Sequence, residues 1–121
     1  MKKPLILVVD DCEVTLKVTR LLLENAGFEV ITRSRPIGTT AEILKIKPDC
    51  VLLDVLMPGI TGDKVTKLIK ESGVATKIVL HSGKETNELR ELARGCGADG
   101  YIKKTTDKHE FINKVKSFLS P

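Results

Sequence analysis

The chain has 121 residues, of which 41% are hydrophobic and 30% are charged, and its formal net charge is +4 at pH 7. This length and composition are typical of one globular domain, so we expect residues 1–121 to form a single unit. Aromatic residues make up 3% of the chain and tryptophan is absent, which leaves few surfaces for stacking nucleobases. Lysine and arginine are scattered among acidic residues, so the sequence does not favour direct binding to nucleic acid.

The N-terminal segment does not have the pattern of a signal peptide. Its apolar run, Leu5–Val9, is five residues long and is followed by two carboxylates. No stretch approaches the roughly 20 apolar residues of a membrane helix. The three cysteines, Cys12, Cys50 and Cys96, are an odd number with wide spacing, which is typical of a reducing compartment. We therefore expect a cytoplasmic protein that does not bind membranes.

The first two predicted elements are the strand Leu5–Val9 and a helix after it. The strand is continuously apolar, as expected for a central strand covered on both faces. Helical periodicity then places four apolar residues on one stripe, and Gly27 is suited to the left-handed cap at the helix end. The residues of this stripe are Val14, Val18, Leu21 and Leu22.

The rest of the chain alternates between strand-length apolar runs and segments long enough for helices. The predicted strands after the first are Phe28–Ile31, Cys50–Leu53, Ile78–Leu80 and Tyr101–Ile102. The predicted helices are Pro36–Ile46, Gly62–Glu71, Thr86–Arg94 and Asp107–Leu119. This alternation predicts an α/β fold with a doubly wound, five-stranded parallel sheet of strand order 2-1-3-4-5, the flavodoxin-like (βα)5 arrangement.

Polar residues follow several of these strands, at the edge where open α/β sheets bind ligands. Asp10 and Asp11 end the first strand and Asp54 ends the third. Ser82 ends the fourth strand and Lys104 follows the fifth. A single aspartate in such a place is explained by capping of exposed amides, but a cap does not require three carboxylates on two adjacent strands. The joint pattern therefore indicates a functional site.

Three carboxylates at close range repel one another and raise one another's pKa unless a cation is present. Oxygen ligands with open water positions suit Mg²⁺, which joins one or two carboxylates to a phosphate. Three carboxylates, one Mg²⁺ and the Lys104 ammonium sum to zero charge. The sequence therefore predicts a magnesium site.

Asp54 is the predicted nucleophile for phosphoryl transfer, because it stands alone at the end of a central strand. The turn at Met57–Gly59 opens the crevice and could aim the Leu56 carbonyl at the metal. Ser82 is expected to meet a phosphoryl oxygen through its hydroxyl, and Lys104 to supply the counter-charge. A carboxylate at this sheet edge is also expected to face solvent.

Three stretches of the sequence resemble the receiver domain of bacterial response regulators, including the chemotaxis regulators of two-component systems. They are Val8–Asp11, Leu52–Gly59 and Gly97–Lys104. The resemblance spans almost the whole chain. It implies that a histidine kinase or phosphotransfer protein passes a phosphoryl group to Asp54, that Asp11 binds Mg²⁺ directly with Asp10 beside it, and that the Leu56 main chain is a further ligand.

The resemblance also implies a switch. Ser82 moves toward the phosphoryl group, the Tyr101 ring turns inward, and the face made by the fourth helix, fifth strand and fifth helix changes shape. That face would bind a downstream output protein or domain, or a second copy of the chain in a dimer. Such a domain catalyses only its own phosphorylation and dephosphorylation and is otherwise not an enzyme.

One position departs from the family pattern, because Thr105 stands where receivers usually have a proline after a cis peptide bond. The cis form costs roughly 3–4 kcal/mol before a residue other than proline, so we expect a trans bond here. A shifted loop makes Lys103 a rival of Lys104 for the phosphate contact. The departure also keeps open an alternative function: a pseudo-receiver that binds proteins without being phosphorylated.

Three further signals carry less weight. A phosphohydrolase with an aspartyl intermediate would commonly have a second aspartate two residues after the nucleophile, where this chain has Leu56. The run Gly95–Gly100 has the letters of a dinucleotide fingerprint but closes a helix instead of opening one. His81 has no acid–base partners at triad spacing, and strand alternation turns it away from Ser82, which favours a packed or partly solvated histidine.

Overall fold

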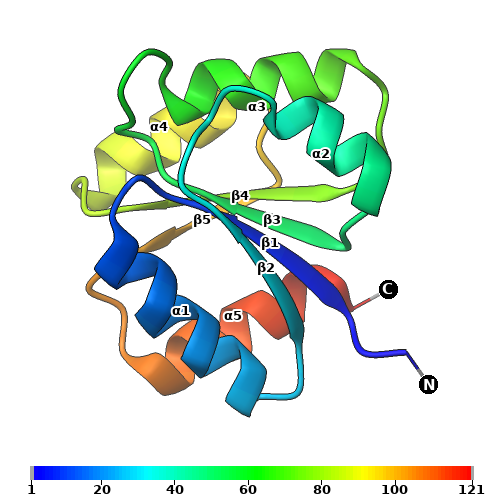
Figure 1. The fold of residues 1–121 in the computed structure, drawn as a ribbon. Coiled ribbons are helices and arrows are strands. Elements are labelled where there is room, and N and C mark those ends of the chain that lie inside the picture. The colour runs from blue at the N-terminus through cyan, green and yellow to red at the C-terminus, as the bar shows by residue number, and fades with distance from the viewer. Residues whose placement is uncertain (1, 121) are drawn as a thin grey trace.

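The computed structural model describes residues 2–120 and has a five-stranded parallel sheet with helices on both faces (Figure 1). In chain order the elements are β1 (Leu5–Val9), α1 (Glu13–Asn25), β2 (Glu29–Arg33), α2 (Thr39–Ile46), β3 (Cys50–Leu53), α3 (Gly62–Glu71), β4 (Lys77–Ser82), α4 (Thr86–Cys96), β5 (Gly100–Lys103) and α5 (Lys108–Leu119). The strand order is β2-β1-β3-β4-β5. The predicted flavodoxin-like fold is therefore confirmed.

The two central strands, β1 and β3, form the middle of the core. Alternate residues of β1 point to opposite faces of the sheet, so Ile6 and Val8 pack under α1 and α5, whereas Leu7 and Val9 pack under α2 and α3. Burying an aliphatic side chain of this size stabilises a fold by roughly 1.5–3 kcal/mol. This explains why both strands read as continuous apolar runs.

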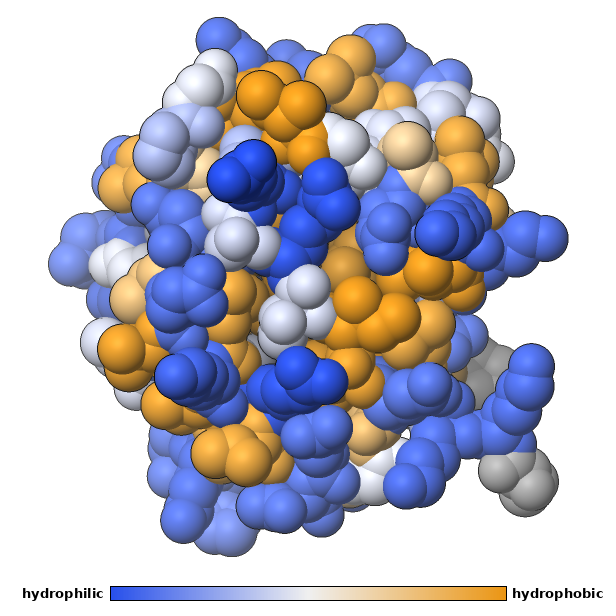
Figure 2. Space-filling model, viewed as in Figure 1, coloured by the Kyte–Doolittle hydropathy of each residue, from blue (hydrophilic) through white to orange (hydrophobic). Residues whose placement is uncertain are grey.

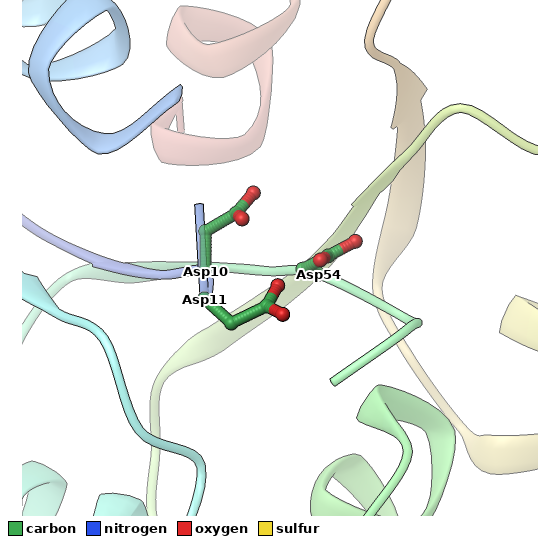
Figure 3. Close-up of side chains that lie close together, drawn as sticks. All are labelled: Asp10, Asp11 and Asp54. Atoms are coloured by element: carbon green, nitrogen blue, oxygen red, sulfur yellow. The ribbon is translucent and has the colours of Figure 1, made fainter. Parts of the chain in front are cut away.

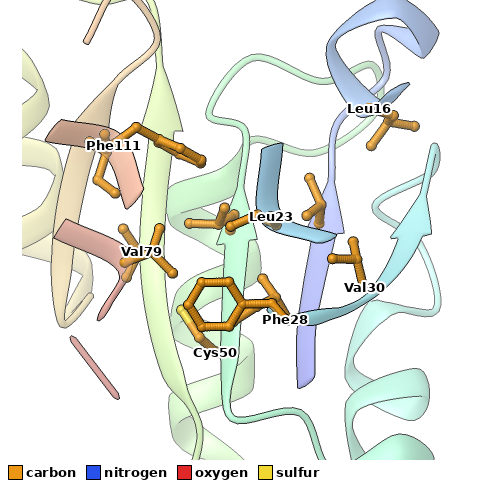
Figure 4. Packing of buried hydrophobic residues seen from close by; sticks show 12 residues of the cluster. Leu16, Leu23, Phe28, Val30, Cys50, Val79 and Phe111 are labelled. Carbon is orange, nitrogen blue, oxygen red and sulfur yellow. The ribbon is translucent and has the colours of Figure 1, made fainter. Parts of the chain in front are cut away.

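The core on the α1 and α5 side joins residues that lie far apart in the sequence (Figure 4). Phe28 and Phe111 supply its aromatic rings, and aliphatic side chains fill the space around them. The labelled members of this cluster are Leu16, Leu23, Phe28, Val30, Cys50, Val79 and Phe111. These contacts hold α1 and α5 side by side on one face of the sheet.

The apolar stripe of α1 lies mostly outside the core, although Leu22, one of its four residues, packs against the core cluster. Val14, Val18 and Leu21 are exposed by 70%, 52% and 61%. The residues that α1 buries are Leu16, Thr19 and Leu23. Because α1 carries apolar side chains on two faces, periodicity alone did not show which face the sheet covers.

The observed bounds differ from the predicted ones mainly at α2. This helix begins at Thr39 and not at Pro36, because Gly38 adopts a left-handed conformation with φ of 89°. The Thr39 hydroxyl donates a hydrogen bond of 2.6 Å to the Pro36 carbonyl, which closes the turn before the helix. In addition, α4 continues to Cys96 and is ended by Gly97 in the left-handed region.

Between residues 2 and 120, no helix combines the length and the apolar character that crossing a membrane requires.

Candidate functional site

Strand pairing places Asp10 and Asp54 next to each other. Val9 and Leu53 are paired in the parallel register of β1 and β3. The Asp54 amide donates a hydrogen bond of 2.9 Å to the Val9 carbonyl, which extends the ladder by one residue. The side chains that follow the two strands therefore emerge at the same edge of the sheet, at the point where the strand order reverses.

Three carboxylates meet at this edge, as predicted (Figure 3). Ligand oxygens of Asp10, Asp11 and Asp54 all lie within 4.8 Å of one another. Asp11 is exposed, but Asp10 and Asp54 are only 1% and 6% exposed. The expectation that the Asp54 carboxylate faces solvent was therefore wrong, because the folded chain buries it.

Lys104 is the cation of the site. Its Nζ lies 2.7 Å from Asp10 Oδ2 and 3.3 Å from Asp54 Oδ1. The Lys104 amide donates to the Ser82 carbonyl at 2.8 Å, which extends the pairing of β4 and β5 and fixes the start of the side chain. Lys103, the rival, points to Glu85 at 3.7 Å instead. The geometry thus favours Lys104 for a phosphate contact.

The loop after Lys104 has no cis peptide bond, and none occurs elsewhere in residues 2–120. The bond before Thr105 is therefore trans, as predicted. With this trans bond, the Lys104 ammonium still contacts the two buried carboxylates, Asp10 and Asp54.

Burial and repulsion govern the charge state of the site. Burial is the main cause that raises the pKa of Asp54, and the nearby Asp10 charge raises it further, although Lys104 and the Leu56 amide oppose the shift. Burial alone would lower the pKa of Lys104, but its contacts with Asp10 and Asp54 outweigh burial and leave this pKa raised. Lys104 therefore stays protonated, and ionised Asp54 is less favoured than an ionised aspartate at the surface would be.

The donor set fits a hard divalent cation. Asp10 Oδ1 accepts a hydrogen bond of 2.9 Å from the Cys12 amide. Asp10 Oδ2 is buried and, among the described residues, has no partner with hydrogen-bond geometry, so its only compensation is the ionic contact with Lys104. Three carboxylates and one ammonium leave two uncompensated negative charges. Oxygen ligands of this kind are those that Mg²⁺ prefers.

Gly62 contributes to the site in a way that the sequence did not reveal. The sequence indicated only that a helix begins at this residue. It begins α3, and its amide donates to the Val55 carbonyl at 2.8 Å. A Cβ at this position would collide with the carbonyl oxygen of Asp54. The absence of a side chain therefore lets α3 begin directly against the backbone of Asp54. The turn that ends at Gly59 and the glycine at the helix start were the only sequence signals.

Ser82 and Tyr101 lie on β4 and β5, next to this edge. Ser82 is 1% exposed, and its hydroxyl accepts a hydrogen bond of 3.2 Å from the Lys84 amide. The Tyr101 hydroxyl accepts a hydrogen bond of 3.2 Å from Arg90 Nε on α4, and the side chain is half-buried. Leu56, two residues after Asp54, has a side chain that is 61% exposed.

Taken together, the doubly wound α/β sheet places an acidic cluster and a lysine at its carboxyl edge, an arrangement suited to binding a metal ion and a phosphate group. The family comparison is specific: the model of the response regulator receiver domain matches residues 6–116. The chain therefore belongs to the response regulator receiver domain family, whose general function is phosphorylation-dependent switching in two-component systems.

Curated relatives agree with this assignment. The alkaline phosphatase synthesis transcriptional regulatory protein PhoP of Bacillus subtilis is 32% identical over 114 residues, which cover 94% of this chain and 48% of PhoP. The polar-differentiation response regulator DivK of Brucella anthropi is 28% identical over 121 residues, which cover 94% of each chain. The chain spans about half the length of the first relatives that it matches.

Solved structures agree as well. A putative response regulator from Chloroflexus aurantiacus superposes with a TM-score of 0.93 at 26% identity, covering 99% of this chain and 100% of that one. The BeF3-activated receiver domain of Klebsiella pneumoniae RstA has a TM-score of 0.90 at 25% identity, covering 97% of this chain and 99% of that one.

The raised pKa of Asp54 predicts that Asp54→Asn stabilises the metal-free protein. Between the usual carboxyl pKa, about 4, and the raised value, the folded state binds more protons than the unfolded state, so stability falls as pH rises through this range. The Asp54→Asn variant has no carboxyl group at this position, so its stability does not fall with pH for this reason. We expect its free energy of unfolding near neutral pH to exceed that of the wild type by on the order of 1 kcal/mol.

Urea unfolding with a metal chelator, followed by circular dichroism between about pH 4 and 7, measures this effect. Asp63→Asn, which removes a carboxylate of α3 outside the cluster, is the matched control and should leave stability nearly unchanged. A wild type that is more stable than Asp54→Asn at every pH would contradict the proposed repulsion.

Proposed function

We propose that this chain is a receiver that accepts a phosphoryl group on Asp54 from a phosphohistidine of a histidine kinase or phosphotransfer protein. The observation that carries the proposal is the buried Asp54 carboxylate, which has Lys104 at 3.3 Å and two further carboxylates close by. Its charge is disfavoured in the metal-free site. A bound divalent cation would compensate this charge and that of the acyl phosphate formed on Asp54.

In the proposed reaction one Asp54 oxygen attacks phosphorus, a P–O bond forms, and the P–N bond to the donor imidazole breaks. The imidazole leaves with the electron pair and takes up a proton. Mg²⁺, held by Asp10, Asp11, Asp54 and the Leu56 carbonyl, would neutralise charge on the phosphoryl oxygens. Lys104 would exchange part of its contact with Asp54 for a phosphoryl oxygen. Its raised pKa keeps it charged for this role.

The proposed output is a change of binding surface. Phosphorylation adds a charge of about −1.5 to −2. Ser82 would leave the Lys84 amide and donate to a phosphoryl oxygen, and Tyr101 would leave Arg90 and turn inward. Those two hydrogen bonds would hold the unphosphorylated state. The surface that changes is formed by α4, β5 and α5, where a downstream output protein or domain, or a second copy, would bind.

Within this proposal, residues 1–121 act as one receiver unit in the cytoplasm, and the unit catalyses only its own phosphorylation and dephosphorylation. The alternative is a pseudo-receiver that binds proteins without phosphorylation. The departure at Thr105 motivates that alternative. The intact pairing of Lys104 with Asp10 and Asp54 favours phosphorylation instead.

Phosphorylation by acetyl phosphate tests the proposal without knowledge of the kinase. The wild type should form an acid-stable, hydroxylamine-labile acyl phosphate only when Mg²⁺ is present, and mass spectrometry should locate it on Asp54. Asp54→Asn should lose the modification and Asp63→Asn should keep it. A wild type that takes up no phosphate with Mg²⁺ would establish the pseudo-receiver, and sustained release of phosphate over many turnovers would indicate a phosphohydrolase.

The two neighbouring lysines provide a second test. Lys104→Gln removes the ammonium that contacts both buried carboxylates and should slow phosphorylation by acetyl phosphate by about tenfold or more. Lys103→Gln removes only a partly exposed pair with Glu85 and should change the rate by less than about twofold. Rates are measured by intact-protein mass spectrometry. Equal effects of the two substitutions would show that Lys104 is not the phosphate contact.

A further inference from the structure

A groove of about 340 Å³ lies between α1 and α5, outside the acidic cluster. Val14, Val18, Leu22 and Phe111 give it apolar walls. Figure 2 shows hydrophobic surface over α1, interrupted by hydrophilic side chains. Clefts that bind small molecules have volumes of about 300–1,000 Å³ and are mostly apolar with a few polar groups. The groove is thus large enough for a small ligand.

His81 lies at the floor of this groove and is not used by the proposed phosphoryl transfer. Its side chain is only 7% exposed, and its ring lies 5.3 Å from the Phe111 ring, centroid to centroid. No side-chain hydrogen bond joins the His81 ring to another residue between 2 and 120. Burial and the Lys104 charge lower the pKa of His81 to about 4, so the ring is neutral near neutral pH.

A neutral imidazole offers one donor and one acceptor to a ligand. His81 lines the groove, and the other polar groups of its lining include the hydroxyls of Thr15 and Thr19. These groups lie below the outer surfaces of the two helices. A small molecule that enters the groove can reach them, whereas a flat protein surface placed across α1 and α5 cannot.

The rim of the groove carries positive charge. Lys108 is exposed and forms no ion pair with the residues that the structure describes, and Lys104 is already paired with Asp10 and Asp54. Lys108 is thus the cation that is free to meet an anionic group of a ligand. Among residues 2–120, no carboxylate lines the groove.

We propose that the groove between α1 and α5 binds a small amphipathic organic anion. Its apolar body packs against Val18 and Phe111, a polar atom bonds to the His81 ring, and its anionic end pairs with Lys108. This groove shares Lys104 with the acidic site but includes none of its three carboxylates, and the proposal does not depend on phosphorylation of Asp54.

Titration of the full chain with 3-phenylpropionate, followed by ¹H–¹⁵N NMR, tests the proposal. We expect saturable shifts at His81 and along α1 and the start of α5. The neutral analogue 3-phenyl-1-propanol should bind at the same place about fivefold more weakly, because it cannot pair with Lys108. This comparison separates the contribution of the anionic end from that of the apolar body.

Two pairs of variants locate the site without disturbing the core. Val18→Ser should weaken binding about fivefold, whereas Leu68→Ser on α3, which is equally exposed at 52%, should leave it unchanged. Lys108→Gln should weaken binding of the anion but not of the alcohol. Lys116→Gln, an exposed lysine on α5 outside the groove, should affect neither.

Absence of saturable shifts, shifts that map to another surface, or equal losses within each matched pair would each overturn the proposal. Since none of these readouts involves phosphate or Mg²⁺, failure here leaves the proposed function standing, and failure of phosphorylation leaves this site standing.

Discussion

The constraint on which this site depends is the burial of two adjacent carboxylates, Asp10 and Asp54, with the single ammonium of Lys104 against both. Asp10 and Asp54 follow paired strands, so the sheet itself brings their side chains together, and both are almost fully buried. Lys104 compensates one charge and leaves the rest unbalanced. A site built in this way is primed for any event that adds positive charge or removes a negative one. Binding of a divalent cation is such an event.

The strand order of the sheet explains why these carboxylates lie together. The chain goes from β1 to β2 on one side and then to β3 on the other side of β1, so the strand order reverses between β1 and β3. The loops that follow these two strands diverge and leave a crevice at the carboxyl ends of the strands. Asp10 and Asp54 lie on the β3 side of β1. On the other side, β2 ends in Thr32 and Arg33 and brings no carboxylate. Charge therefore collects on one side of the reversal point, where β4 and β5 can bring Ser82 and Lys104.

The sequence was sufficient for the features that depend on local pattern and strand order. Continuous apolar runs identified β1 and β3, and the aspartates directly after them followed from parallel pairing. It was insufficient where tertiary contacts decide. Val14 and Val18 have the spacing of a core face, yet the sheet covers Leu16 and Leu23 instead.

Local sequence pattern also could not predict that Asp54 is buried, or which of Lys103 and Lys104 contacts the carboxylates. Both features depend on contacts with residues that are distant in the sequence. The Lys104 amide bonds to the Ser82 carbonyl, and this contact directs Lys104 to the carboxylates and Lys103 to Glu85. The role of Gly62 depends likewise on the close approach of α3 to the Asp54 carbonyl. A single glycine in a sequence does not reveal which backbone lies against it.

The most direct test of this account is a calorimetric titration of the unphosphorylated protein with MgCl₂ near neutral pH. Binding of one Mg²⁺ per chain, lost in Asp11→Asn and retained in Asp63→Asn, is the result that the account predicts. A wild type that shows no saturable binding, or binds Mg²⁺ equally well without the Asp11 carboxylate, would contradict the claim that these acids form a cation site.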